Sequence, residues 1–300
     1  MPASPGRRFL TRTRARSCSS VAAPRGAGAW MAKPATGLSR RAVLVGGIAG
    51  LLGKSGASRA GNRSSPEPLT FVLVHGSWQG GWCWYRVRKI LGGFGHLAFS
   101  PTLTGLGDRD HLVNPSVDVD LHARDVAEMI AFENLRNVVL VGHSYGGLVI
   151  AAVAELMPGR LKRLVYLDGL IPDDGQSHMD IVPSIKDSTI AAARQRGAGW
   201  LIPPMSAAQL GITDAGDAAW FEERARPQPL ATWEQPVRLK STDAARIRKS
   251  FIWCTQFTLG AMAEKARRAG WDVHELPTGH DAMVTMPHQL SQVLITCAQT

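Results

Sequence analysis

Short runs of apolar residues alternate with helical patterns along the chain from residue 69 to its C-terminus. The runs are near-continuous in Val, Leu, Ile and Phe, as is typical of strands in a parallel sheet that helices cover on both faces. The expected strands are Thr70–His75, Leu97–Pro101, Asn137–Gly142, Arg163–Asp168, Ser250–Thr255 and Trp271–Leu276. The expected helices are Trp82–Leu91, Leu121–Phe132, Gly146–Met157, Leu259–Ala269 and Pro287–Ala298. This alternation predicts a doubly wound α/β domain with a mostly parallel sheet.

One interval interrupts the alternation. From Ile171 to Arg248 there is no strand pattern, and the segment is rich in proline and tryptophan. A disordered loop would contain few aromatic residues, so we expect a folded helical cap over residues 171–248. The core then consists of residues 69–170 and 249–300, and a polar linker over residues 61–68 precedes it.

The formal net charge of +10 is concentrated near the N-terminus. Residues 1–60 contain 11 Lys and Arg but no Asp or Glu, which leaves 23 basic and 24 acidic side chains in residues 61–300. A body this close to neutral does not support binding to nucleic acid or to another polyanion.

The first 60 residues follow the order of an export signal. Arg40 and Arg41 precede the apolar run Ala42–Gly53, and small residues follow up to Ala60. The paired arginines favour a twin-arginine-like leader that is removed from a periplasmic or secreted bacterial protein; a disordered basic N-terminus is the alternative. The apolar run falls short of the roughly 20 residues that cross a bilayer, so we expect no stable membrane span. Met31 is an alternative start that would give a leader of conventional length.

Three cysteines lie in the body of the chain, at Cys83, Cys254 and Cys297. An odd number permits one disulfide at most and leaves at least one free thiol. Their spacing does not resemble a metal site, and no metal or organic cofactor is implied.

The motif G-x-S-x-G at Gly142–Gly146 carries the strongest chemical signal. The apolar strand before it and the apolar helix after it are the setting that a nucleophile elbow requires, with Ser144 at the apex. Gly142 and Gly146 allow strand and helix to approach closely, and the helix N-terminus behind Ser144 favours developing negative charge. A chance match at a buried turn is the alternative interpretation.

A serine nucleophile needs a base and an oxyanion hole. His280 follows the last expected strand and is favoured as the base, with His274 as its competitor. Tyr145, the residue after the nucleophile, is expected to donate one oxyanion N–H. Ser77 is expected to donate the other, because Gly76 lets the backbone turn sharply after the first strand.

These motifs resemble the α/β-hydrolase superfamily, and more narrowly the branch of plant methyl-ester esterases, hydroxynitrile lyases and many bacterial esterases. The segments that carry the resemblance are His75–Trp84, Pro101–Gly107, the elbow and Gly279–Met283, within about residues 70–300. Lyases of this branch resemble a variant with Thr at the position of Gly76 and Lys at that of Asp281. Without that lysine a leaving cyanide lacks its positive partner, so the resemblance implies esterase rather than lyase chemistry.

The acid of the expected triad departs from the branch. The branch normally supplies an Asp shortly after the strand that ends here at Cys254 and Thr255, but no carboxylate occurs from Gln256 to Met262. Asp168 closes the strand Arg163–Asp168 at the edge where ligands bind in open α/β sheets. We hypothesise that the acid has moved to Asp168; the alternative is that Asp168 only caps a turn.

The expected function is ester hydrolysis by two-step acyl transfer, with Ser144 as nucleophile and a small or medium apolar ester as substrate. Thioesterase, amidase or lyase chemistry in the same pocket is one alternative. A ligand-binding protein of this fold without turnover is another. The oligomeric state and the identity of the ester stay open.

Overall fold

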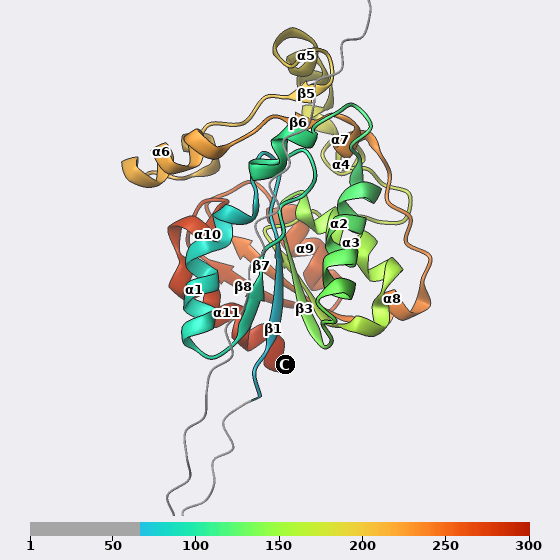
Figure 1. Cartoon of the computed structure of the whole chain (residues 1–300), viewed down its shortest axis with the longest axis vertical. Coiled ribbons are helices and arrows are strands. Elements are labelled where there is room, and N and C mark those ends of the chain that lie inside the picture. The colour runs from blue at the N-terminus through green and yellow to red at the C-terminus, as the bar shows by residue number, and fades with distance from the viewer. Residues whose placement is uncertain (1–66) are drawn as a thin grey trace, which may run out of the picture. The chain divides into compact units, whose positions relative to one another are not determined.

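A computed structural model describes residues 67–300, in which a parallel β-sheet lies between helices (Figure 1). The sheet has six strands in the order β2-β1-β3-β4-β7-β8, and every neighbouring pair is parallel. The strands are β1 (Thr70–Val74), β2 (Leu97–Phe99), β3 (Val138–His143), β4 (Leu161–Leu167), β7 (Arg248–Cys254) and β8 (Asp272–Leu276). The predicted α/β class and the six expected strands are confirmed.

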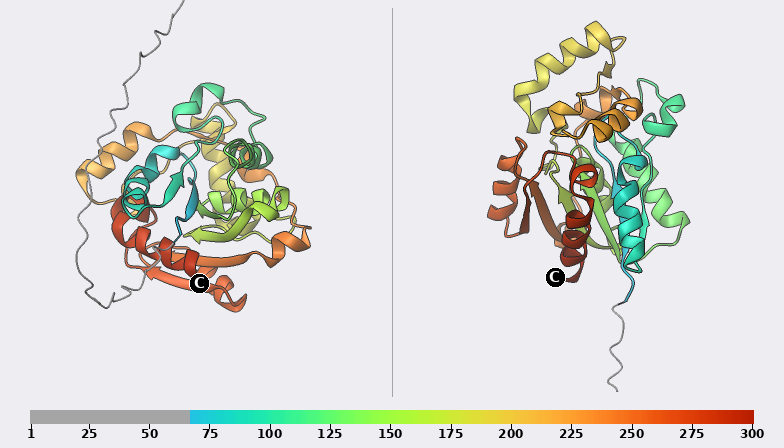
Figure 2. Two further views of the ribbon diagram at one scale, coloured as in Figure 1. Left: turned by 60° about the horizontal axis from the view of Figure 1, so that its bottom comes forward. Right: turned by 90° about the vertical axis from the view of Figure 1, so that its left-hand side faces the viewer.

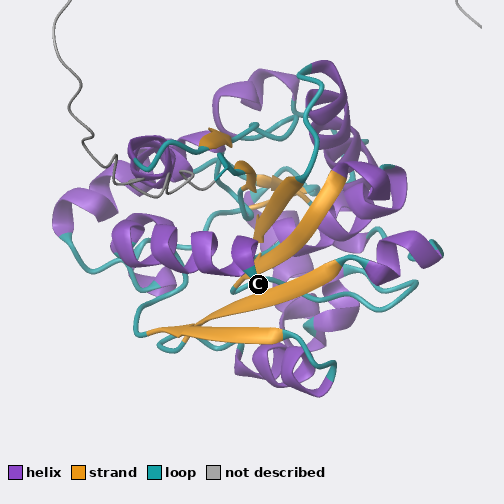
Figure 3. Cartoon of the chain, turned by 90° about the horizontal axis from the view of Figure 1, so that it is seen from below, coloured by secondary structure: helices purple, strands orange, loops and turns teal. Residues whose placement is uncertain are grey.

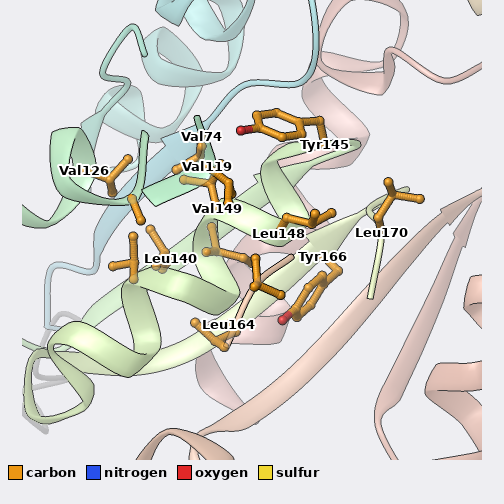
Figure 4. Close-up of a cluster of buried hydrophobic side chains, with 14 of the residues drawn as sticks. Val74, Val119, Val126, Leu140, Tyr145, Leu148, Val149, Leu164, Tyr166 and Leu170 are labelled. Carbon is orange, nitrogen blue, oxygen red and sulfur yellow. The ribbon is translucent and has the colours of Figure 1, made fainter. Parts of the chain in front are cut away.

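Helices cover both faces of the sheet, as Figure 3 shows from below. They are α1 (Tyr85–Gly93), α2 (Val119–Phe132), α3 (Gly146–Leu156), α9 (Gly260–Arg268) and α11 (Pro287–Gln299). Alternate strand residues face opposite sides: Leu140 packs with α2, α3 and α9, whereas Val139 packs with α1 and α11. Figure 4 shows Leu140 within the first of these two cores, beside Leu148 and Val149 of α3. The near-continuous apolar strands thus reflect burial on both faces.

The segment between β4 and β7 forms short helices and one small strand pair. The helices are α4 (His178–Ile181), α5 (Lys186–Arg196), α6 (Ala215–Arg224), α7 (Ala231–Glu234) and α8 (Thr242–Arg246). Strands β5 (Leu201–Ile202) and β6 (Gln228–Pro229) pair antiparallel, where the sequence showed no strand pattern. Two residues are too few for a period-two pattern, so the pair left no signal.

Several contacts hold this segment over the carboxyl ends of the strands (Figures 1 and 2). Trp78, just after β1, donates its indole N–H to Ile202 O at 3.2 Å. His280, after β8, donates its backbone N–H to Leu210 O at 2.9 Å. The segment therefore closes over the sheet edge at which the candidate catalytic residues meet.

The predicted leader over residues 1–60 and most of the predicted linker over residues 61–68 lie outside the described residues. Within residues 67–300, no helix has both the length and the apolar character needed to cross a bilayer. Cys83, Cys254 and Cys297 are free, buried thiols.

Candidate active site

The turn after β3 holds Ser144 in a left-handed conformation, with φ of 53°. The Ser144 N–H donates to Leu167 O of β4 at 3.2 Å, and Ser144 O accepts from Gly147 N and Leu170 N, each at 3.0 Å. A Cβ atom on Gly142 would collide with the Gly146 backbone. The fold therefore holds a strained serine at the start of α3, and the glycine at position 142 is a steric requirement.

His280 and Asp168 form a buried pair. His280 Nδ1 lies 2.6 Å from Asp168 Oδ2, and the second oxygen of this carboxyl accepts from Cys254 N at 3.3 Å. Asp168 follows the last residue of β4, with φ of 39°, and its backbone N–H donates to Ile252 O of β7 at 2.7 Å. Two neighbouring strands thus fix the carboxyl against one nitrogen of the imidazole.

Burial governs the electrostatics of this pair. It lowers the pKa of His280 by disfavouring the imidazolium, and it raises the pKa of Asp168, against the opposing effect of the Cys254 N–H. A neutral imidazole is the form that can accept a proton from a serine hydroxyl. The ionised form of Asp168 accepts from Nδ1, keeps the N–H on that side and leaves Nε2 as the acceptor.

Two other rings pack against the His280 ring. Phe257 stacks on it, with centroids 4.1 Å apart and planes 24° apart, and His143 lies on it at 4.5 Å and 49°. Phe257 belongs to the loop after β7, where the sequence offered no carboxylate. Sequence reasoning assigned Phe257 no role, because stacking depends on how two distant loops close on each other.

The loop after β1 lies directly against the elbow. A Cβ atom on Gly76 would come within 3.0 Å of Ser144 Cβ and 2.7 Å of His143 Nδ1. Neither the Ser77 N–H nor the Tyr145 N–H donates to any acceptor within residues 67–300. The Tyr145 ring is buried, and its Oη lies 3.0 Å from His122 Nδ1. Two unpaired N–H groups beside a serine are the arrangement that stabilises an oxyanion.

Ser144, His280 and Ser77 line one cavity of about 320 Å³. Most of its wall is apolar or aromatic. The remaining lining residues are Trp78, Leu170, His178, Val182, Ser184, Ile185, Met205, Leu210, Trp233, Phe257, Thr258 and Leu259. Such a lining suits an apolar organic molecule.

Two further residues that bear on the assignment are His274 and Asp281. His274, the competitor for the base, is in β8 and does not line this cavity. Asp281 is fully buried and accepts a hydrogen bond from the Gln79 side chain rather than contacting the His280 ring. The structure thus brings together Ser144, His280, Asp168 and Ser77, whereas the hydrogen bond that Asp281 makes is to Gln79 and not to the His280 ring.

A family model for the alpha/beta hydrolase family matches residues 71–293. The carbendazim hydrolyzing esterase of a Nocardioides species is 37% identical over 237 residues, which span 75% of this chain and 97% of that protein. Methylesterase 1 of Arabidopsis thaliana is 35% identical over 109 residues, 36% of this chain and 41% of that protein.

The chain is also similar in fold to a solved structure. That structure is an extracellular α/β-hydrolase from a Paenibacillus species, which shares structural and functional homology with tobacco salicylic acid binding protein 2. It superposes with a TM-score of 0.69 at 26% identity, covering 78% of this chain and all of the other. Because the family model spans most of residues 67–300 and the Nocardioides relative is matched over nearly its full length, this chain belongs to the alpha/beta hydrolase family.

Proposed function

We propose that the chain is a serine esterase that cleaves a small or medium-sized carboxylic ester through an acyl-enzyme. The observation that carries this proposal is the contact of 2.6 Å between His280 and Asp168 at a cavity that Ser144 also lines. A buried carboxyl on the second ring nitrogen is the arrangement by which a serine hydrolase orients its base. The Nocardioides esterase and the Arabidopsis methylesterase support ester hydrolysis, with methyl esters among the first substrates to test.

The chemistry proceeds in two matched steps. His280 Nε2 takes the Ser144 proton while Oγ bonds to the ester carbonyl carbon, and the carbonyl oxygen becomes an oxyanion between the Ser77 and Tyr145 N–H groups. His280 then protonates the alkoxy oxygen, the C–O bond breaks and the alcohol leaves. Water attacks the acyl-enzyme with His280 again as base, and Ser144 regains its proton as the acid departs.

A panel of p-nitrophenyl and methyl esters of increasing acyl length tests the proposal on the full chain, with Ser144→Ala as the control. We expect turnover that Ser144→Ala abolishes, and a mass increase at Ser144 after reaction with an aryl phosphonate. If no ester gave turnover or an initial burst above the Ser144→Ala control, the protein would be a ligand-binding member of the family.

We also propose that residues 1–60 are a twin-arginine-like export leader and that the mature chain acts in the periplasm or outside the cell. Arg40, Arg41 and the apolar run behind them support this, as does the extracellular location of the similar Paenibacillus hydrolase. In a bacterial host that has the twin-arginine pathway, the wild-type chain should reach the periplasm. A chain with Arg40→Lys and Arg41→Lys should stay in the cytoplasm, and equal export of both chains would contradict the proposal.

A further inference from the structure

His178 forms part of the cavity wall, and sequence reasoning gave it no role. It is the first residue of α4, a short helix held by a capping box in which Ser177 and Asp180 exchange hydrogen bonds. The residue is 6% exposed, and it lines the same cavity as Ser144 and His280. Burying an imidazole on the wall of a mostly apolar cavity costs free energy unless its nitrogen atoms form hydrogen bonds.

The ring of His178 is held in place. It stacks on Trp233 with centroids 3.7 Å apart and planes 13° apart. Trp233 is anchored in turn, because its indole N–H donates to Ser77 Oγ at 3.0 Å. The imidazole is therefore fixed relative to the loop that carries the proposed oxyanion donor Ser77.

Neither ring nitrogen of His178 forms a hydrogen bond with another residue among residues 67–300. Nδ1 is inaccessible to solvent and has no partner in another residue, whereas Nε2 is accessible. Burial lowers the pKa of His178 to about 3, so the ring is neutral and carries one N–H. An N–H at Nδ1 would find no acceptor in another residue, so the tautomer with the N–H on the accessible Nε2 is the less costly one.

The other polar groups of the cavity are engaged or exposed. Ser144 and His280 belong to the proposed chemistry, and Ser77 Oγ already accepts from Trp233. Ser184 and Thr258 are exposed. Within the described cavity wall, His178 is the buried polar side chain that has neither a partner nor a part in the reaction. A buried polar group without a partner is rare in native proteins and calls for an explanation, and a bound ligand on the cavity side is one.

We infer that His178 Nε2 donates a hydrogen bond to the substrate, and that the preferred ester carries a hydrogen-bond acceptor on a ring that fits between the apolar walls. This inference rests on the proposed function for the identity of the ligand as an ester. The inference concerns selectivity between substrates. An ester with an acceptor at the right position gains a hydrogen bond in the bound state, whereas a hydrocarbon ring leaves the His178 N–H unpaired.

Methyl benzoate and its three pyridine analogues, methyl picolinate, nicotinate and isonicotinate, provide a test in which one CH becomes N at three positions. The measured quantity is the kcat/KM of each pyridine ester divided by that of methyl benzoate. In His178→Phe, which keeps a flat ring against Trp233, we expect this ratio to fall about 3- to 10-fold for at least one isomer, as for the loss of one hydrogen bond. Ser184→Ala, which removes an exposed polar group from the same cavity, should leave the ratio within about twofold.

A purely structural role would lower kcat/KM for benzoate and pyridine esters alike, and unchanged ratios for all three isomers would overturn the inference. His178→Gln keeps a donor and should retain part of the preference, which protects the test if the phenylalanine variant folds poorly. Binding of the same esters to Ser144→Ala, with and without His178→Phe, separates the inference from the proposed function. If the wild-type chain hydrolysed nothing, the ratio of Kd values would still decide whether His178 selects the acceptor.

Discussion

The replacement Asp168→Asn isolates the acid of the proposed triad. Asn has nearly the same shape, and its amide oxygen can keep the hydrogen bond from Cys254 N that Asp168 Oδ1 now accepts at 3.3 Å. The amide NH₂ group then faces His280 Nδ1, where Asp168 Oδ2 now lies at 2.6 Å. A donor at this point forces Nδ1 to accept, so the proton moves to Nε2, and His280 can no longer take the Ser144 proton.

The size of the effect follows from this change of tautomer. The same replacement in a serine-protease triad lowers kcat by about 10⁴, which corresponds to about 5 kcal/mol of transition-state stabilisation. We expect a loss of this order in kcat on a p-nitrophenyl ester, with an unfolding temperature close to that of the parent. Titration of the active sites with a phosphonate gives the concentration of active enzyme, so that inactive molecules do not lower the measured kcat.

Asp281→Asn is the matched control. This second buried carboxyl follows His280 directly but bonds Gln79, whose amide N–H an Asn oxygen can accept equally well. Its kcat should stay within about tenfold of the parent, well short of the loss expected for a tautomer change. A kcat for Asp168→Asn within tenfold of the parent would refute the assignment, and a large loss in Asp281→Asn alone would move the acid to that residue.

Three further predictions concern the stacked ring, the elbow and the response to acid. Phe257→Ala removes the ring stacked on His280 and should lower kcat/KM about 2- to 10-fold; a rise in KM at constant kcat would show that Phe257 acts on binding alone. Gly142→Ala should cost about 1–3 kcal/mol in the free energy of unfolding, because its Cβ meets the Gly146 backbone. Gly159→Ala is the control, since no atom lies within 4 Å of its Cβ, and equal unfolding temperatures for the two variants would contradict the steric argument. Burial lowers the pKa of His122 to about 4, against about 6.5 in the unfolded chain, so the unfolded chain binds the proton first as pH falls. Stability should therefore drop by about 2 kcal/mol through this group between pH 8 and pH 5, and urea titrations of His122→Gln should show that much less pH dependence.

The sequence predicted the sheet well because its strands are buried on both faces. A continuous apolar run of this length favours a buried strand, and the glycine-rich turn motif after Val141 strengthens that prediction. Asp168 could be placed for the same reason, since it ends a run of this kind and the carboxyl ends of neighbouring parallel strands meet at one edge. The shift of β4, which begins at Leu161 rather than Arg163, changes no residue of the site.

The cavity wall could not be predicted in this way. The stack of His178 on Trp233 joins two short helices of the segment between β4 and β7, and neither helix is long enough to show a period. The contact of Phe257 with His280 likewise depends on loops that meet only after the sheet has formed. Residues of this kind are set by tertiary packing, so they leave no local pattern in the chain.

Because Asp168 lies at the end of β4, the segment of short helices separates two members of the proposed triad from the third along the chain. Ser144 and Asp168 both precede the segment of short helices, on adjacent strands that the bond from Ser144 N to Leu167 O joins, and His280 follows it. A break at the exposed Gly199 would therefore leave nucleophile and acid on one fragment and the base on the other. Each fragment alone would be inert, so recovered ester cleavage would report directly that the two pieces had reassembled, which makes the fold a natural template for a split-enzyme sensor.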